Sequence, residues 1–357
     1  MRFYSGKHRY YCGIDLHTKT MYICIIDEDG KILFHKNAPV NAEILLRIIK
    51  PFLPDIAICV ECIFTWYWIA DFCEERDIPF VLGHALYMKA IHGSKTKNDK
   101  IDSHKIALLL RGGILPMAYV YPAGLRSTRD LLRRRMHFKN KRSELLAHIQ
   151  NTKSQYNMPD FEKSIKYKSN RLHIASQFID ESVQQSIKFD LALIDHYDEL
   201  LRRVELYILQ HAKAHRPQDL FLLQTINGVG KILALVMLYE IHDIHRFERV
   251  HHFSSYSRLV KPTKESAGKI KSGGGKKMGN VYLKWAFSEA VLLLIRESDD
   301  VKELHNKLKN RYGKARALAI LSHKLGRAVY YMLKNKKAFN VKQFVNDKKA
   351  VPAELNV

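Results

Sequence analysis

The run Tyr10–Thr20 constrains the fold more than any other stretch of the chain. Tyr10–Ile14 is mostly apolar and β-favouring, Asp15 ends it, and a second β-rich run, Met21–Ile26, follows after a short polar segment. The pattern predicts two neighbouring strands with a carboxylate at the end of the first. Such a carboxylate suits a cation ligand, although an aspartate that only forms a turn would give the same pattern.

Beyond this run, β-rich and helical patterns alternate as far as residue 111. Further strands are predicted at Lys31–His35, Asp55–Val60 and Pro79–Gly83. Helices are predicted at Asn41–Phe52, Thr65–Arg76 and Ser103–Arg111. Three antiparallel strands followed by alternating helices and strands indicate an α/β domain with a mixed sheet, parallel in its second half.

Three further acids stand at similar places in the pattern. Glu61 ends the predicted strand Asp55–Val60, as Asp15 ends the first one. Asp99 and Asp102 are three residues apart, so at a helix start they lie on one face. Because oxygen ligands in this number suit Mg2+ or Mn2+, the sequence predicts a metal site formed by all four acids. Alternatively, Asp99 and Asp102 only complement the helix dipole.

The composition indicates the partner. The chain carries 59 Lys and Arg residues against 36 Asp and Glu, a formal net charge of +23. A protein this basic usually binds a polyanion, because each phosphate that it neutralises releases condensed counterions. Nucleic acid is therefore the expected partner.

The cysteines and the apolar runs indicate the compartment. All five cysteines lie in the first quarter of the chain, and this odd number argues against a disulfide framework. Cys59 and Cys62 have CxxC spacing, but the sequence offers no second pair with zinc-ligand spacing. The start of the chain lacks the apolar core of a signal peptide, and no apolar run approaches the roughly 18 residues of a membrane span. We therefore expect a reducing, cytoplasmic setting and no membrane partner.

Leu125–Lys153 is predicted to form one long basic helix, since its apolar residues recur at helical spacing and neither Gly nor Pro interrupts it. A loop at Asn157–Lys168 and a second long helix at Asp190–Ala214, which could return antiparallel to the first, are predicted to follow. A solvated charged face, a phosphate-tracking arm and a coiled-coil dimer element all fit this pattern. The candidate nucleic-acid ligands on the first helix are Arg129, Arg133, Arg134, Lys139 and Arg142.

Two glycine-containing segments follow. Ile226–Lys231 places two glycines in a tight turn before an apolar helix, like the hairpin of a helix-hairpin-helix motif, although a glycine C-cap explains the turn equally well. Its candidate phosphate contacts are Asn227, Gly228, Gly230 and Lys231. Lys261–Asn280 is rich in glycine and lysine and contains Ser266 and Ser272; it is either an anion-binding segment, through Lys269 and Lys276, or a flexible basic loop.

Several motifs occur together along the chain. The amino-terminal part contains GIDLHTKT, Val60-Glu61 and KTKNDKIDSHKIA, and the carboxy-terminal part contains LLQTINGVGKILA, Phe247, ESAGK and KMGNVYLKWAF. In this combination the chain resembles the DEDD-type insertion-sequence transposases, a family now described as bridge-RNA-guided recombinases. The resemblance extends from about Tyr11 to Met332. The combination is specific, whereas any one motif alone is not.

The resemblance implies an RNase H-like (RuvC-like) α/β domain over residues 1–122, whose acidic tetrad is Asp15, Glu61, Asp99 and Asp102. It also implies a basic coiled-coil linker over residues 123–215 and a small, mostly helical transposase domain over 216–340 that carries a nucleophilic serine; residues 341–357 are expected to form a tail. Ser266 matches that serine better than Ser272. Many relatives place the serine directly before glycine, whereas Ala267 intervenes here.

By the same resemblance, the expected reaction is DNA strand exchange, with a covalent phosphoserine link at Ser266 and Mg2+ or Mn2+ at the tetrad. The expected partners are double-stranded donor and target DNA, a guide RNA and further copies of the chain in a homodimer or homotetramer. The expected location is the nucleoid of a bacterial or archaeal cell. Two alternatives remain: a metal-dependent nuclease or junction resolvase that uses water, and a non-catalytic nucleic-acid-binding protein.

Overall fold

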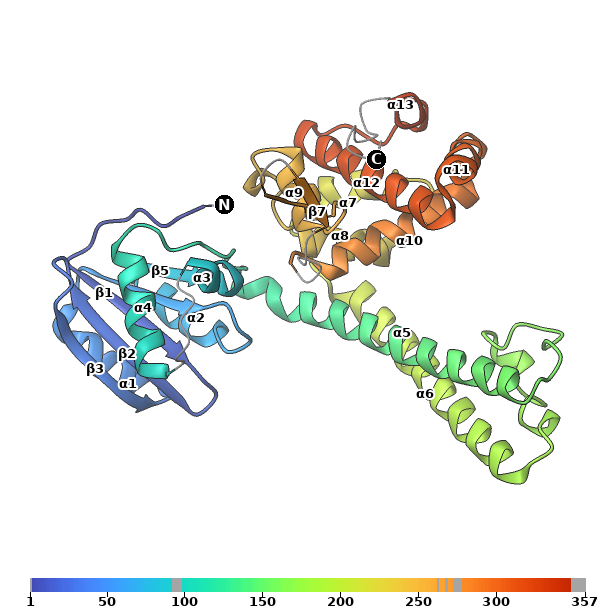
Figure 1. Cartoon of the computed structure of the whole chain (residues 1–357), viewed down its shortest axis with the longest axis horizontal. Helices are drawn as coiled ribbons and strands as arrows, with labels where there is room; N and C mark the ends of the chain where they lie inside the picture. Colours follow the sequence, from blue (N-terminus) through green and yellow to red (C-terminus); the bar gives the residue numbers. More distant parts are fainter. Residues whose placement is uncertain (1, 92–97, 262, 267–268, 273–277, 348–357) are drawn as a thin grey trace. The chain divides into compact units, whose positions relative to one another are not determined.

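The computed structural model describes residues 2–91, 98–261, 263–266, 269–272 and 278–347, and the chain forms two compact units (Figure 1). The first unit is Met1–Arg126 and the second is Ser127–Val357. Among the described residues, no helix has both the length and the apolar character that crossing a bilayer would require.

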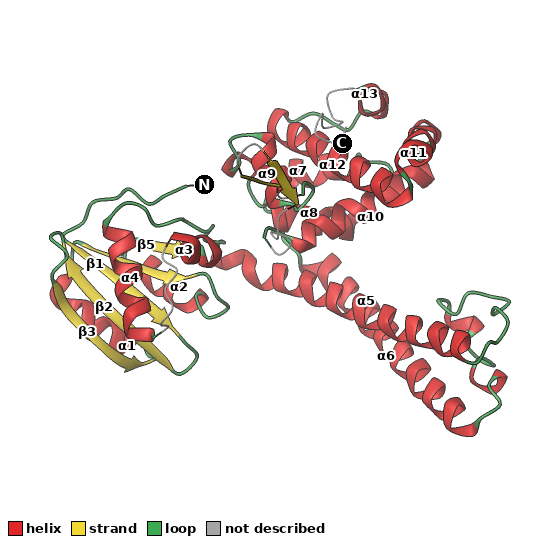
Figure 2. Ribbon diagram, in the orientation of Figure 1, coloured by secondary structure: helices red, strands yellow, loops and turns green. Residues whose placement is uncertain are grey.

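The first unit is built on a five-stranded mixed sheet, drawn in yellow in Figure 2. The strands lie in the order β3-β2-β1-β4-β5, and their bounds are β1 (Tyr10–Leu16), β2 (Thr20–Asp27), β3 (Ile32–Pro39), β4 (Ile56–Glu61) and β5 (Phe80–Gly83). β1 pairs antiparallel with β2, and β2 with β3, whereas β1–β4 and β4–β5 are parallel. This confirms the predicted mixed sheet and is consistent with an α/β RNase H-like domain.

Helices cover both faces of this sheet. One core contains Cys12, Ile14 and Leu16 of β1 together with residues of α1 (Ala42–Ile49) and α2 (Tyr67–Glu74). A second core, on the opposite face, contains Tyr11 of β1 and residues of α4 (Asp99–Arg111). The 3-10 turn η1 (Lys50–Phe52) follows α1, and the sequence did not predict α3 (Ala85–Ile91) after β5.

Gly13 brings α4 into direct contact with β1. A Cβ atom at Gly13 would lie 2.3 Å from the carbonyl oxygen of Ser103 and 2.4 Å from the amide nitrogen of Ala107. Both neighbours are backbone atoms of α4, so they cannot rotate away as a flexible side chain would. Glycine is therefore required here by the close approach of the helix to the strand.

We predict that Gly13→Ala lowers the free energy of unfolding of the first unit by about 1–3 kcal/mol, because α4 must move away from β1. Gly124→Ala is the matched control, since no atom lies within 4 Å of a Cβ at that position. Amide hydrogen exchange in β1 and β4 measures the effect in the full chain. Equal protection in the two variants would contradict the close-approach account.

The second unit contains nearly all of a long helical hairpin, α5 (Ala123–Gln155) and α6 (Glu181–His211) (Figure 1). The first four residues of α5 belong to the first unit. Three ion pairs show that the helices run antiparallel, because the residue number on α6 falls as that on α5 rises. They join Arg135 to Glu205 at 2.5 Å, Arg142 to Asp198 at 2.5 Å and His148 to Asp190 at 2.5 Å. The predicted antiparallel return of the second helix is therefore seen within this unit.

The boundaries of the hairpin differ from those predicted. The connection between the helices extends to Asp180 and includes the 3-10 turns η2 (Lys168–Asn170) and η3 (Ala175–Gln177). α6 begins at Glu181 rather than Asp190, because the Asp180 side chain accepts hydrogen bonds from the amides of Ser182 and Val183 and so caps a helix start without apolar periodicity.

The rest of the second unit is a helical bundle followed by a short hairpin and four more helices. Its elements are α7 (Pro217–Gln224), α8 (Lys231–Ile241), η4 (Ile244–Arg246), α9 (Val250–Tyr256), β6 (Thr263–Ser266), β7 (Lys269–Ser272), α10 (Val281–Glu297), α11 (Asp299–Tyr312), α12 (Lys314–Asn335) and α13 (Val341–Asn346). Every residue of α8 from Leu233 to its end is buried. The sequence did not predict the antiparallel pair β6–β7.

The predicted tail begins later than expected. Residues 341–346, assigned to that tail, form helix α13, because its Phe344 is buried. The Lys324 ammonium donates a hydrogen bond to the Val345 carbonyl oxygen at 3.1 Å, which attaches the short helix to α12. The last ten positions, 348–357, lie outside the described residues.

Two stacked histidines lie in the second unit. The rings of His215 and His242 are 5.2 Å apart, and Tyr239 contacts His215 edge-on. Burial lowers the pKa of both rings, and nearby Arg216 lowers it further; the pKa of His242 falls to about 4, although Asp243 opposes the shift. Both rings are therefore neutral in the folded protein at neutral pH.

We predict that the second unit loses stability as the pH falls from about 6.5 towards 4. The unfolded histidines take up protons near pH 6.5, whereas the folded His242 does so only near 4, so protonation favours unfolding in this window. The loss should be about 1 kcal/mol, less than the full shift implies because both residues are only partly buried. His242→Asn should flatten the pH dependence measured by chemical denaturation. Asparagine tolerates the positive φ of 56° at this position.

Candidate metal centre and serine-containing hairpin

Asp15 and Glu61 lie at the carboxyl ends of adjacent parallel strands. The register pairs Ile14 of β1 with Val60 of β4, which places the next residues, Asp15 and Glu61, at the same edge of the sheet. Side chains alternate along a strand, so Asp15 projects to the face of Tyr11 and Gly13, against which α4 packs. Glu61 also projects to this face, because it comes two residues after Cys59 and four after Ala57, which both belong to the core on this face.

Asp99 and Asp102 lie in the first turn of α4. The helix begins there because the Asn98 side chain accepts a hydrogen bond from the Lys100 amide at 2.8 Å. His35 of β3 also holds this turn, since its Nε2 lies 2.8 Å from the Lys100 carbonyl oxygen and 3.3 Å from Ser103 Oγ. The helix start is therefore fixed to the sheet edge that carries Asp15.

His17, which was not predicted as a site residue, lies between two of these acids. Its Nε2 is 3.6 Å from Asp15 Oδ2 and 3.4 Å from Asp99 Oδ2. One ligand atom from each of these three residues lies within 4.8 Å of the others. The available signal was its position two residues after Asp15, in the turn that leads to β2.

The electrostatics of Asp15 show that the four acids interact. Burial raises the pKa of the Asp15 carboxyl, whose side chain is 13% exposed; His17 lowers it, and the charges of Asp99, Asp102 and Glu61 each raise it. The structure therefore brings Asp15 and Asp99 together with His17, whereas Glu61 and Asp102 lie outside this group among the described residues and act on Asp15 through their charges.

This donor set fits a divalent cation. Carboxylate oxygens are the ligands that Mg2+ and Mn2+ prefer, and several carboxylates near one another repel unless a positive charge lies between them. This repulsion is seen at Asp15, because the charges of the other three acids each raise the pKa of its carboxyl. The neighbouring cations are the imidazole of His17, when protonated, and Lys105, whose Nζ lies 3.9 Å from Asp102 Oδ1.

The candidate serines lie in the short antiparallel pair of the second unit. Ser266 ends β6 and faces Lys269 of β7 in the register, and Ser272 ends β7 and pairs with Thr263. The backbone of these residues is described, but their side chains are not. Ala267 and Lys276 lie outside the described residues.

The chain that leaves this hairpin is anchored at Gly279 and Asn280. The Asn280 amide donates to the Tyr256 carbonyl oxygen at 2.5 Å, and Arg258 Nε donates to the Gly279 carbonyl oxygen at 2.8 Å. Gly279 has a φ of 91°, and a Cβ there would lie 2.6 Å from the Tyr256 carbonyl oxygen. The end of α9 and the start of α10 are therefore joined at the base of the segment that carries both serines.

A buried carboxylate extends this anchor to α5. Glu240 of α8 is only 2% exposed and accepts hydrogen bonds from Arg133 at 2.7 and 2.9 Å and from Asn280 Nδ2 at 2.7 Å. Arg129 Nε lies 3.3 Å away. Burial by itself would raise the pKa of Glu240, but the hydrogen bond from Arg133 and the charges of both arginines hold it below its usual value. Asn280 also caps α10 through the amides of Tyr282 and Leu283.

We predict that Glu240→Gln lowers the free energy of unfolding of the second unit by about 3–5 kcal/mol, because two partly buried guanidinium groups lose their buried counter-charge. Glu289→Gln is the control: its pair with Lys139 is about one-third exposed, so the loss should stay below about 1 kcal/mol. Urea unfolding followed by circular dichroism compares the two variants. Equal losses would show that burial of the Glu240 network contributes little.

Most of the basic residues predicted on α5 have acidic partners within this unit. Arg129 and Arg133 contact Glu240, Lys139 contacts Glu289 at 3.1 Å and Arg142 contacts Asp198. Arg134 is exposed. A nucleic-acid role for these five residues stays a prediction, and their partners account for much of the charge pattern without a ligand.

The glycine turn before α8 has the expected local form. Gly228 has a φ of 81°, and a Cβ there would lie 2.8 Å from Leu293 Cβ, so this glycine is required by conformation and packing. Asn227, Gly230 and Lys231 are exposed beside it. Phosphate binding by this turn stays a prediction.

Two family models match the chain. A transposase model of the DEDD IS110 type matches residues 12–158, which include all four acids, and a model described as the transposase IS116/IS110/IS902 family matches residues 221–306, which include both serines. The chain belongs to the DEDD-type insertion-sequence transposases. The transposase is also 25% identical, over 92% of its length and 90% of the relative's, to a protein named transposase for insertion sequence element IS1111A from Coxiella burnetii (strain RSA 493 / Nine Mile phase I). It is therefore a DNA transposase or recombinase.

Proposed function

We propose that this transposase cuts and rejoins strands of donor and target DNA through a serine nucleophile, assisted by a divalent cation at the acidic tetrad. The observation that carries the proposal is the group of Asp15, His17 and Asp99, whose ligand atoms lie within 4.8 Å of one another at a strand end and a helix start. The charges of Asp102 and Glu61 also act on Asp15. These four acids lie in the range that the DEDD-type family model matches.

Asp15, Glu61, Asp99 and Asp102 would hold Mg2+ or Mn2+. When bound, the cation supplies positive charge beside a phosphate oxygen and so stabilises the negative charge that develops during phosphodiester cleavage. The protein holds the four carboxylates in advance: the sheet fixes two, and α4, packed on Gly13, fixes the others. His17 is placed to hold Asp15 and Asp99 in position through its Nε2.

The proposed nucleophile is Ser266, with Ser272 as the second candidate. Its Oγ attacks the phosphorus of a DNA strand, a bond from oxygen to phosphorus forms, and the bond to the deoxyribose oxygen of the leaving strand breaks. The serine proton ends on that leaving oxygen, and the phosphoserine link keeps the energy of the broken bond. A deoxyribose hydroxyl of another strand then displaces the serine, so rejoining needs no nucleotide cofactor.

The proposed assembly follows from the separation in sequence between the four acids and the two candidate serines. The acids belong to the first compact unit and both serines to the second, so an active site formed by two copies of the chain satisfies the chemistry in a homodimer or homotetramer. A guide RNA that selects donor and target DNA is proposed from the family resemblance, and the net charge of +23 suits a chain that holds both nucleic acids.

A water-using nuclease is the rival function, and one observation favours it: all four acids lie in one compact unit, so that unit could bind a cation without either serine. In a nuclease, an activated water would replace the serine Oγ. No covalent intermediate would then form. The two functions are therefore distinguished by the chemical state of the protein after cleavage.

We predict that cells carrying the insertion element and this transposase yield a covalent protein–DNA adduct, whose modified peptide maps to Ser266 by mass spectrometry. Ser266→Ala should abolish the adduct and strand exchange, Ser272→Ala should keep both, and Asp15→Asn should lower their yield by roughly 10²–10³-fold through lost charge stabilisation.

Cleavage that persists in Ser266→Ala without an adduct would establish the nuclease, and an adduct mapped to residue 272 would reassign the nucleophile. Unchanged strand exchange in Asp15→Asn would refute the tetrad. Circular dichroism of each variant controls for loss of folding.

A further inference from the structure

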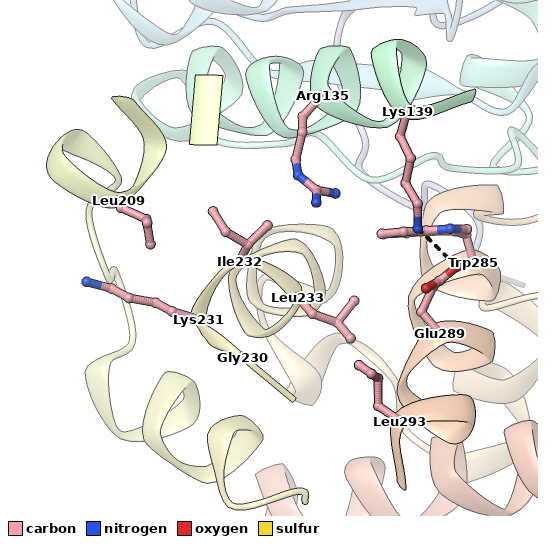
Figure 3. A pocket seen from close by; sticks show the side chains of 10 residues that line it. All are labelled: Arg135, Lys139, Leu209, Gly230, Lys231, Ile232, Leu233, Trp285, Glu289 and Leu293. Carbon is pink, nitrogen blue, oxygen red and sulfur yellow. Dashed lines mark ion pairs between the residues drawn. The ribbon is translucent and has the colours of Figure 1, made fainter. Parts of the chain in front are cut away.

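A cavity of about 350 Å³ opens between helices α5, α6, α8 and α10 of the second unit (Figure 3). It lies wholly within that unit, and none of its lining residues is one of the four acids or belongs to the serine-containing hairpin. Its walls combine an aromatic ring, aliphatic side chains and cations. Proteins that bind single-stranded nucleic acid combine aromatic rings and cations in this way.

The ring is that of Trp285, on α10. Trp285 is partly buried, and the Lys139 ammonium lies over its face, 4.7 Å from the ring centroid. Figure 3 shows Trp285 and Lys139 at one end of the cavity and Lys231 at the other, with Ile232 and Leu233 of α8 between them. The cavity therefore presents an aromatic ring at one end, a positive charge at the other end and aliphatic side chains between them.

The charges in the cavity are mainly positive. Arg135 and Lys139 descend into it from α5, and each has one acidic partner, Glu205 at 2.5 Å and Glu289 at 3.1 Å (Figure 3). Lys231 is exposed, and no carboxylate lies within 4.0 Å of its ammonium among the residues that the structure describes. A phosphate near Lys231 would therefore meet an uncompensated positive charge.

Gly230 keeps the Lys231 end of the cavity open. Its φ of −78° is one that any residue adopts, and no atom lies within 4 Å of a Cβ placed there, so neither conformation nor packing requires glycine. Gly228, two residues earlier, differs because its positive φ and its contact with Leu293 do require glycine. The missing side chain at Gly230 leaves the first amides of α8 accessible from the cavity.

We propose that this cavity binds one unpaired nucleotide of the nucleic-acid substrate, with its base stacked on Trp285 and a phosphate of its strand at Gly230 and Lys231. In this proposal the base takes the place of the Lys139 ammonium over the ring, and Lys139, whose pair with Glu289 is about one-third exposed, turns towards a phosphate. Stacking of a base on an aromatic ring tolerates any sequence, since every base has a π-face. The proposal rests on the proposed function, and it adds that the transposase holds a strand that is locally single.

The size of the cavity favours a single base over a duplex. An open cavity of about 350 Å³ between four helices accommodates a base with its sugar, whereas the stacked pairs of a duplex hide their faces from any protein ring. Duplex contact through the phosphate backbone would not use Trp285. Single-stranded and duplex oligonucleotides of the same sequence therefore test the proposal against simple electrostatic attraction.

The experiment uses the full chain in EDTA with Ser266→Ala as the background, so that binding is measured without metal or strand cleavage. A fluorescent single-stranded oligonucleotide is titrated at fixed salt, and a second one, containing 5-iodouracil, is cross-linked by light. We expect Trp285→Ala to weaken single-strand binding by about 5- to 150-fold and Trp285→Phe to retain most of it. The cross-link should map to Trp285, and duplex affinity should be unchanged by either substitution.

Surface variants keep the test valid if Trp285→Ala does not fold. Gly230→Ala should weaken single-strand binding, whereas Gly124→Ala, an equally open position, should not. Lys231→Gln should also weaken single-strand binding. Lys302→Gln, which removes the same charge from another exposed position, should not. Any of three results would overturn the proposal. They are equal losses of affinity for single-stranded and duplex DNA, unchanged binding in Gly230→Ala and Lys231→Gln, and a cross-link that maps to a residue other than Trp285. Intact single-strand binding, together with the absence of an adduct in the protein that keeps Ser266, would instead count against the serine mechanism alone.

Discussion

The packing of α4 against β1 at Gly13 is the contact on which the first unit depends. Backbone atoms of Ser103 and Ala107 occupy the space that any side chain at Gly13 would need. This contact aligns the first turn of α4 with the edge where β1 and β4 end, so that Asp99 lies beside Asp15 and the charges of Asp102 and Glu61 also act on Asp15. The acids repel one another, and the packing of the hydrophobic core on this face opposes that repulsion. A site of this kind is held in position before any cation binds.

The second unit depends on a different interaction, the buried charge network at Glu240. It joins α5 and α8 to Asn280, which caps α10 at the end of the serine-containing segment. A buried ion pair of this kind contributes little net stability but is costly to break, so it favours one arrangement of the three helices. The base of the segment that carries Ser266 is therefore fixed to the long hairpin, and the proposed strand-binding cavity lies between the same helices.

The sequence predicted the parts of this structure that depend on local patterns. Runs of apolar, β-favouring residues placed the strands, and the acids at strand ends and at a helix start follow from those elements. The register of β1 and β4 and the faces of the sheet then bring Asp15 and Glu61 together, because residues at the ends of parallel neighbours share an edge.

The remaining features depend on contacts between distant residues or on local signals weaker than periodicity. Arg129 and Arg133 have the pattern of a phosphate-binding face, and nothing near them in sequence indicates Glu240 as their partner. The early start of α6 depends on one capping residue, Asp180, and the β6–β7 pair forms in a segment without alternating apolar residues. His17 was missed because its role depends on Asp99, which the fold alone brings to it.

The most direct test of the central claim is to soak crystals of the transposase in Mn2+ and to record anomalous diffraction at the manganese edge. The account predicts a peak bonded to carboxylate oxygens of Asp15 and Asp99, with Glu61 and Asp102 beside it. A crystal in which the four acids lie close together but Mn2+ occupies other sites, or no site, would contradict it.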